Sequence, residues 1–179
     1  AFVHRMRRAL TIANEEIHEE ALRDDKLRGM GTTATLAGLR AGVVYLAQVG
    51  DSRAYLMRKK ALARITRDQS VIQDLIDSGV LSEQEARGVR DNRILQALGT
   101  SPTVTPAVTY HDLRRDDVLL LCSDGLSRVV SDEEILEVVS GTDDCLAVCD
   151  QLIALANARG GPDNVTVLLA RVAGDGLGP

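Results

Sequence analysis

The chain has 179 residues, enough for one domain of ordinary size with a buried core. Hydrophobic residues make up 45% and charged residues 26%, which is the balance of a globular protein, and the formal net charge is −5. A negative chain with only 2% aromatic residues argues against a nucleic-acid partner, which requires a cationic surface and, for single strands, aromatic stacking.

The sequence also argues against a membrane protein and a disulfide-bonded one. We find no apolar run near the roughly 20 residues of a membrane span, and no signal-peptide pattern. The three cysteines, Cys122, Cys145 and Cys149, are odd in number and lack Cys-x-x-Cys spacing, which indicates reduced thiols in a cytoplasmic protein. We expect Cys122 to be a core residue; a zinc site on Cys145 and Cys149 is an alternative, but no nearby His completes it.

The first segment reads as an amphipathic helix. Apolar residues recur every three or four positions, and the opposite positions are charged and read as a solvated face. The apolar positions are Val3, Met6, Leu10, Ala13, Ile17 and Ala21. The pattern begins at the first residue with no capping residue before it, so we expect the chain to be cut from a longer sequence.

Three short segments rich in β-branched or alternating apolar residues follow: "ATLAGLR" (34–40), "VVYLAQV" (43–49) and "AYLMR" (54–58). Their connections are too short for crossover helices, so we predict an antiparallel meander, which "LARIT" (62–66) continues.

Residues 70–92 read as a helical insertion between strands. The apolar period becomes helical after Ser70, and Gly79 ends this first helix. Ser82 with Glu85 three residues later is a capping box, which predicts the start of a second helix.

The remaining elements complete an α+β domain. We predict strands at 104–110 and 118–122, a helix capped by Ser131 and Glu134, a helix over 145–157, a buried closing strand over 164–172 and a disordered tail over 174–179. The absence of βαβ alternation favours helices packed on stacked antiparallel sheets, in one domain over 1–173.

Three aspartates share one pattern, since each lies near a glycine at a turn bordering an apolar strand: Asp51 in "VGDSR", Asp124 in "CSDGL" and Asp163 in "GGPDNVTV". A carboxylate at a strand end is held by the sheet yet faces outward, and several such groups would supply the oxygen ligands that Mg²⁺ or Mn²⁺ prefers. Aspartate beside glycine is also a common turn device, so the spacing alone leaves both interpretations open.

Six segments together resemble the metal-dependent protein phosphatases of the type 2C (PPM) family, most closely its bacterial serine/threonine branch. They occur in the family's order from about Leu10 to Val172: "GMGTTAT", "VGDSRAYL", "ITRDQS", "RILQALGT", "DDVLLLCSDGLSRVVSDEEI" and "GGPDNVTVLLARV".

The resemblance implies a sandwich of two antiparallel sheets flanked by helices, with two Mn²⁺ or Mg²⁺ ions in a cleft at one end. By matching position, Asp124 and Asp163 would be ligands of the paired metals, and Asp51 would serve a third, weaker metal site. Asn164 would orient the neighbouring ligand without binding metal itself. Residues 70–92 would form the variable flap beside the cleft.

The implied activity is hydrolysis of phosphoserine and phosphothreonine in protein substrates. Two cations about 3.5–4 Å apart can activate a bridging water and clamp the phosphoryl oxygens. The chemistry requires no Cys or Ser nucleophile, in agreement with the absence of a Cys-x5-Arg loop from the sequence.

The chain departs from the family pattern in three places. We do not find the Arg-x-x-Asn-Glu-Asp-like strand or the Asp-Gly-x-Gly-Gly turn with which the family begins, and Asp175-Gly176 resembles that turn only superficially. Gln69 stands where the family has His, and we favour a loop contact that Gln satisfies over lost catalysis.

These departures lead us to expect that the 179 residues alone are not sufficient for metal binding and catalysis. With Asp124 and Asp163 but no bridging Asp, the repulsion between two dications is largely uncompensated, so we expect these residues alone to bind metal poorly and hydrolyse little. Missing N-terminal strands would leave sheet edges open to dimerisation. The simplest explanation is a fragment of a longer enzyme, and the alternative is a non-catalytic phosphatase-like binding or regulatory module.

Overall fold

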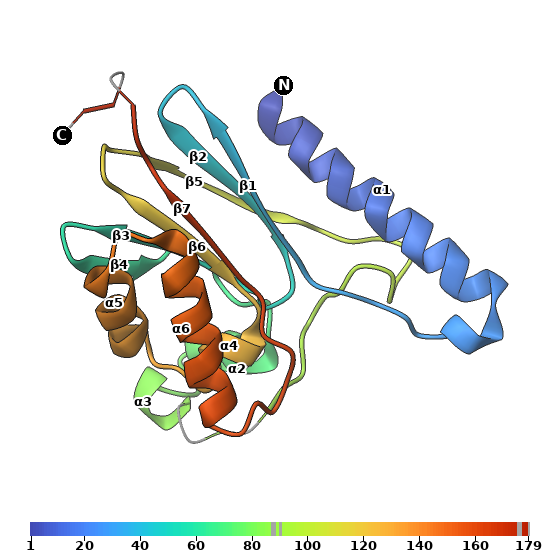
Figure 1. The fold of residues 1–179 in the computed structure, drawn as a ribbon. Helices are drawn as coiled ribbons and strands as arrows, with labels where there is room; N and C mark the ends of the chain where they lie inside the picture. The colour runs from blue at the N-terminus through green and yellow to red at the C-terminus, as the bar shows by residue number, and fades with distance from the viewer. Residues whose placement is uncertain (87–88, 90, 175–176, 179) are drawn as a thin grey trace. The chain divides into compact units, whose positions relative to one another are not determined.

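The computed structural model describes residues 1–86, 89, 91–174 and 177–178 (Figure 1). Its helices are α1 (Phe2–Arg23), the 3-10 turn η1 (Asp25–Leu27), α2 (Val71–Asp77), α3 (Glu83–Ala86), α4 (Asp124–Ser127), α5 (Asp132–Gly141) and α6 (Cys145–Ala158). Its strands are β1 (Ala34–Arg40), β2 (Val43–Val49), β3 (Arg53–Arg58), β4 (Ala61–Arg64), β5 (Ala107–Asp112), β6 (Val118–Cys122) and β7 (Val167–Arg171).

The strands form two antiparallel sheets, ordered β1-β2-β5 and β4-β3-β6-β7, and helices flank them. The predicted α+β class is therefore confirmed. The predicted meander is wrong, because β2 and β3 are consecutive in sequence but belong to different sheets. Gly50 lies in the connection between them with φ +99°, a left-handed conformation that glycine adopts at little cost and that turns the chain out of the first sheet.

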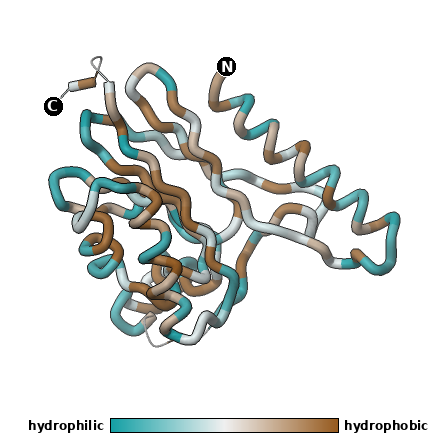
Figure 2. Tube along the Cα trace, viewed as in Figure 1, coloured by the Kyte–Doolittle hydropathy of each residue, from teal (hydrophilic) through white to brown (hydrophobic). Residues whose placement is uncertain are grey.

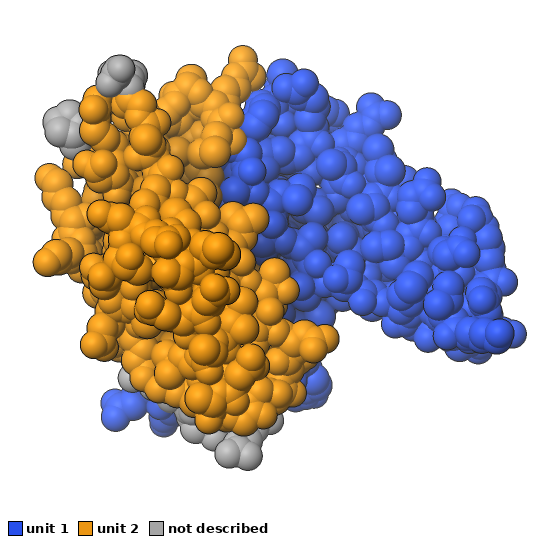
Figure 3. Space-filling model, viewed as in Figure 1, with its two compact units in different colours: residues 1–38, 45–51, 67–109 blue, residues 39–44, 52–66, 110–179 orange. Residues whose placement is uncertain are grey.

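The residues group into two compact units, coloured separately in Figure 3: residues 1–38, 45–51 and 67–109, and residues 39–44, 52–66 and 110–179. Each unit is built from segments distant in sequence, and we describe each by itself. The single domain over 1–173 stays a prediction.

In the first unit, the amphipathic character predicted for α1 is confirmed. Met6 and Leu10 are buried in a cluster with Ala47, Val49 and Leu98, and the charged positions of the helix are exposed.

One polar residue lies on the buried side of α1, and the apolar pattern did not indicate it. The side-chain amide of Asn14 accepts the Gly99 N–H at 2.9 Å and donates to the Ser101 carbonyl at 3.0 Å. His18, one turn later on α1, contacts the Gly99 carbonyl at 2.9 Å. The helix therefore holds the 99–101 loop through side-chain hydrogen bonds that satisfy a buried amide.

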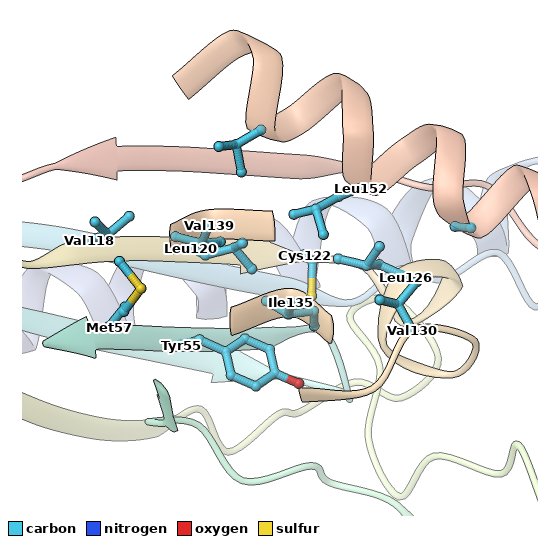
Figure 4. Packing of buried hydrophobic residues seen from close by; sticks show 12 residues of the cluster. Tyr55, Met57, Val118, Leu120, Cys122, Leu126, Val130, Ile135, Val139 and Leu152 are labelled. Carbon is cyan, nitrogen blue, oxygen red and sulfur yellow. The ribbon is translucent and has the colours of Figure 1, made fainter. Parts of the chain in front are cut away.

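In the second unit, Figure 2 shows hydrophobic stretches along the sheet and the helices beside it, and alternate residues of β3 and β6 pack against α5 and α6 (Figure 4). Tyr55, Leu120 and Cys122 contact a cluster that contains Ile135 and Leu152. The prediction that Cys122 is a core residue is confirmed, since only 4% of it is exposed. The Tyr55 hydroxyl donates to Asp132 at 3.0 Å, and burial raises the pKa of this phenol well above its ordinary value.

The closing strand differs from the prediction of a buried strand over 164–172. Strand β7 covers only Val167–Arg171 and pairs with β6 on one side, so it is an edge strand of its sheet. Leu168 is 54% exposed as a result. An apolar run cannot by itself distinguish a central strand from an edge strand. Strand β5 likewise begins three residues later than the 104–110 prediction and ends at Asp112.

The predicted caps and insertion helices are confirmed where they are described. Ser131 and Glu134 form the reciprocal capping box at the start of α5, and Ser82 and Glu85 exchange the same bonds before α3. Residues 87, 88 and 90 of the insertion lie outside the described residues, as do Asp175-Gly176 and residue 179 of the expected tail. Within the described residues, no helix combines the length and apolar character of a membrane-spanning segment.

Candidate metal-binding site

Strand β6 ends at Cys122, Ser123 is the N-cap of the short helix α4, and Asp124 is the first residue of that helix. Its carboxylate forms an ion pair with Arg128, one turn later, at 2.6 Å, and 25% of the side chain is exposed. The sheet therefore fixes the backbone of Asp124, and the carboxylate keeps an exposed surface.

Ser123 brings the segment of Asp124 beside the segment of Asp163. Its hydroxyl donates to the Asn164 carbonyl at 3.2 Å and accepts the Thr166 N–H at 2.9 Å, while its own N–H donates to the Thr166 carbonyl at 3.1 Å. These bonds extend the β6–β7 ladder, in which Cys122 pairs with Val167, past the end of the sheet. Two aspartates about 40 positions apart in sequence therefore lie at the same end of the same two strands.

Gly125 allows this approach because the 163–164 backbone lies against it. A Cβ at position 125 would contact the Asn164 carbonyl oxygen far inside normal distance and would lie 3.0 Å from the Asn164 carbonyl carbon. Gly125 is absent from the residues with positive φ, so the glycine serves close packing and not a special backbone conformation.

An ion pair anchors the start of the loop that carries Asp163. Arg159 caps α6 and donates to both carboxylate oxygens of Glu134 on α5, one of them at 2.7 Å, and to the Val129 carbonyl. Hydrogen bonds from Arg159, and then from the Ser131 N–H, lower the pKa of Glu134 to about 2. The carboxylate that caps α5 therefore also fixes the exit of α6.

Asp163 itself is exposed, and its Oδ1 accepts the backbone N–H of Asn164 at 2.7 Å. The contact between Asn164 and its neighbour is thus made by the backbone amide. The role predicted for Asn164, orienting an adjacent ligand, stays a prediction.

Asp51 belongs to the other unit and is buried, with 9% exposed. The preceding Gly50 donates its N–H to the side-chain oxygen of Gln69 at 2.8 Å and accepts the Gln69 N–H at 3.0 Å. Gln69 therefore makes a loop contact through its side chain, as expected. The metal-binding role of Asp51 stays a prediction.

Comparison with known proteins gives a consistent result. Residues 4–74 match the family model described as "Protein phosphatase 2C". The Stp1 serine/threonine phosphatase of Staphylococcus aureus is 33% identical and superposes with a TM-score of 0.90, covering 96% of this chain and 68% of that one. The chain belongs to the protein phosphatase 2C family.

Two further comparisons concern PstP. The serine/threonine protein phosphatase PstP of Mycobacterium tuberculosis is 40% identical over 167 residues, which are 92% of this chain and 32% of that protein. A structure of the catalytic domain of PstP in complex with two manganese ions is 39% identical with a TM-score of 0.79, covering 89% of this chain and 67% of that chain. This phosphatase 2C chain therefore spans about a third of full-length PstP and two thirds of its solved catalytic domain.

The donors in this member of the family fit a divalent cation in type but not in number. Asp124 and Asp163 offer carboxylate oxygens, which Mn²⁺ and Mg²⁺ prefer, and an octahedral ion takes about six ligands. Within residues 1–86, 89, 91–174 and 177–178, no group of three or more His, Cys, Asp or Glu side chains is arranged to hold a metal ion. The described residues therefore do not complete a ligand set by themselves, and the metal-binding roles of Asp124 and Asp163 stay predictions.

Sequence reasoning identified the carboxylates but missed the residues that position them. The hydroxyl of Ser123 and the guanidinium of Arg159 act on partners 41 and 25 positions away, and no local pattern contains those pairings. The capping-box prediction found Glu134 but not its second partner, Arg159.

Proposed function

We propose that this chain carries part of the active site of a metal-dependent phosphatase that acts on phosphoserine and phosphothreonine in proteins. Asp124 and Asp163 would hold a shared Mn²⁺ or Mg²⁺, and Asp51 would serve a further, weaker metal site. The observation that carries the proposal is the junction of Ser123 and Gly125 with the 163–166 segment, because it supports the half-buried Asp124 carboxylate and the exposed Asp163 carboxylate at one end of the same strands.

Different residues of the chain would have different roles in such a site. Ser123 and Gly125 hold the two carboxylate-bearing segments together, Arg159 anchors the start of the Asp163 loop, and Arg128 restrains the Asp124 carboxylate. When bound, divalent cations supply activation of a water and charge neutralisation for the phosphoryl group. The protein then contributes the rigid, correctly spaced oxygen ligands.

The names of the relatives support the proposed substrate class. Stp1 and PstP are named serine/threonine phosphatases, and the structure of PstP with two manganese ions supports a metal-dependent reaction in this family. Which of Mn²⁺ and Mg²⁺ is used, the location of the protein in the cell and dimerisation through sheet edges stay predictions.

A chimera tests the proposal. Residues of the PstP catalytic domain that match this chain are replaced by the chain, and phosphate release from a phosphothreonine peptide is measured with and without Mn²⁺. We expect Mn²⁺-dependent hydrolysis that falls at least about 100-fold in Asp124→Asn and in Asp163→Asn, because even residues that only support metal ligands are worth about 10–100-fold.

Asp150→Asn, an exposed change on α6, is the matched control and should retain the activity of the chimera. A folded chimera that hydrolyses nothing would favour the non-catalytic module instead. Activity that survives both Asp124→Asn and Asp163→Asn would contradict the assignment of the ligands.

A further inference from the structure

A second site lies in the same unit as Asp124, at the other end of strands β3 and β6. A cavity of about 590 Å³ is lined there by residues of the β3–β4 turn and of the β5–β6 turn. It is lined by Met57, Arg58, Lys59, Lys60, Arg114, Arg115, Asp116, Asp117 and Leu177. The register pairs Arg53 with Cys122 at one end of these strands and Met57 with Val118 at the other. Met57 lines the cavity, and its partner Val118 precedes Asp124 by six positions. At about 3.3 Å per residue, the cavity is therefore about 20 Å from Asp124.

The charge of this cavity opposes that of the chain. Five cationic and two acidic side chains line it, a formal balance of +3 in a chain of net charge −5. The buried Asp117 carboxylate accepts hydrogen bonds from the Arg58 guanidinium at 2.8 and 2.7 Å, so the position of this pair in the lining is fixed. Lys59, Lys60 and Arg114 are exposed around it, and nothing in the described residues forms an ion pair with either lysine.

The backbone conformation of Lys59 and Lys60 is a second observation that points to a functional site here. Lys59 and Lys60 are the two central residues of the β3–β4 hairpin, and their φ values are +48° and +63°. Two positive φ values are the requirement of a type I′ turn, for which Asn-Gly is the preferred sequence. Two lysines at these positions oppose local backbone preference, and strained residues of this kind gather at functional sites.

We propose that this cavity binds an acidic segment of a protein partner. Its volume lies in the range of binding-site cavities, and Met57 and Leu177 add apolar side chains to the cationic lining. The cations lie at the end of β3 and in the two adjoining turns and do not form a stripe with interleaved aromatic residues, which favours a short acidic peptide over a nucleic acid. The proposal is independent of the phosphatase activity.

The test is peptide binding to the 179-residue chain. A fluorescein-labelled peptide rich in Asp and Glu, and its Asn/Gln counterpart, are titrated with the protein and followed by anisotropy. The informative variant is Lys59→Asn with Lys60→Gly, which removes two charges while giving the turn its preferred sequence. The melting temperature of this variant is measured alongside binding and should rise. A loss of binding in a variant that is at least as stable cannot be attributed to unfolding.

The matched control is Arg7→Ala with Arg8→Ala, which removes the same charge from the exposed side of α1. We expect the acidic peptide to bind, salt to weaken it, and the lysine variant to lose about tenfold or more in affinity, equivalent to about 1.4 kcal/mol, while the arginine variant changes little.

Equal affinity in the two variants, no binding of the acidic peptide, or equal binding of the neutral peptide would overturn the proposal. An oligonucleotide of matched charge that binds more tightly than the peptide and is lost in the lysine variant would assign the cavity to nucleic acid and would overturn it too.

Discussion

At one end of β3 and β6 lie Asp124 and the loop of Asp163; at the other end lie the two turns that carry Lys59, Lys60 and Arg114. The acidic end is built by close packing and by hydrogen bonds between side chains and backbone, so its carboxylates are held by a junction of β6 with β7. The cationic end is built by hairpin turns braced by the ion pair of the buried Asp117 with the half-buried Arg58, and its lysines project from a strained backbone.

The difference concerns what each end tolerates. A rigid junction suits metal ligands, which must keep their spacing, and it should be damaged by small steric changes. Hairpin turns suit a charged docking surface, whose side chains can adapt to a partner, and they should tolerate changes that relieve backbone strain. The following variants test this contrast, beginning with the largest expected effect.

Gly125→Ala should be the most damaging change at the acidic end. The added Cβ meets the backbone of Asn164 and lies 3.3 Å from the Asp163 carbonyl oxygen, and backbone cannot move aside as a flexible side chain can. We expect a loss of about 3 kcal/mol in the free energy of unfolding, measured by urea denaturation. Gly141→Ala, where no heavy atom lies within 4 Å, is the control and should change stability by less than about 1 kcal/mol. Equal effects of the two changes would refute the close-packing account.

Asp117→Asn tests the ion pair that braces the cationic end. Asp117 accepts bonds from the Arg58 guanidinium and from the Arg114 N–H at 2.7 Å. Burial alone would raise the pKa of Asp117, but these bonds outweigh it and the pKa lies below its ordinary value. Since Arg58 is 30% exposed, we expect a loss of about 2 kcal/mol, below the range for a fully buried pair. Asp116→Asn, an exposed neighbour, should be nearly neutral in the same denaturation experiment.

Ser123→Ala should cost about 1 kcal/mol of stability, the usual contribution of a hydrogen bond, because its hydroxyl bonds to Asn164 and Thr166. Ser78→Ala, which removes a single bond from an exposed hydroxyl to the Leu75 carbonyl, is the control. The variants are compared by thermal unfolding. A Ser123→Ala protein as stable as the control would show that the junction does not depend on this hydroxyl.

The smallest effect concerns pH and the anchor of the Asp163 loop. The pKa of Glu134 is lowered to about 2 in the folded protein, so its contribution to stability is present above its ordinary pKa near 4.5 and is lost as the pH falls toward 2. Glu134→Gln keeps the capping geometry but removes this dependence. We expect the variant to show a shallower fall in stability over this window, measured by denaturation at several pH values. Identical pH profiles would contradict the linkage.

Much of the fold was predictable because it is encoded locally. The periodicity of α1, the capping box of Ser131 and the apolar run of β6 each lie within one short window, and all three were confirmed. Two features were not predicted: the sheet to which β3 belongs and the edge position of β7. Both depend on pairing between distant strands.

The candidate sites likewise combine features that a local sequence pattern predicts with contacts that it does not. The aspartates at glycine-containing turns could be found by pattern, whereas the bonds of Ser123 and Arg159 and the gathering of cations around Asp117 appear only in three dimensions. Lys59 and Lys60 form a short basic pair in the sequence that suggests no site until the β5–β6 turn is placed beside it.

The most direct test of the metal assignment is Mn²⁺ binding to the chain itself, measured by the loss of the free Mn²⁺ signal in electron paramagnetic resonance. With two carboxylates at the junction, the chain should bind Mn²⁺ more weakly than the PstP catalytic domain does. Asp124→Asn and Asp163→Asn should each weaken binding about tenfold or more, while Asp150→Asn leaves it unchanged. Mn²⁺ binding that neither Asp124→Asn nor Asp163→Asn alters would contradict the account.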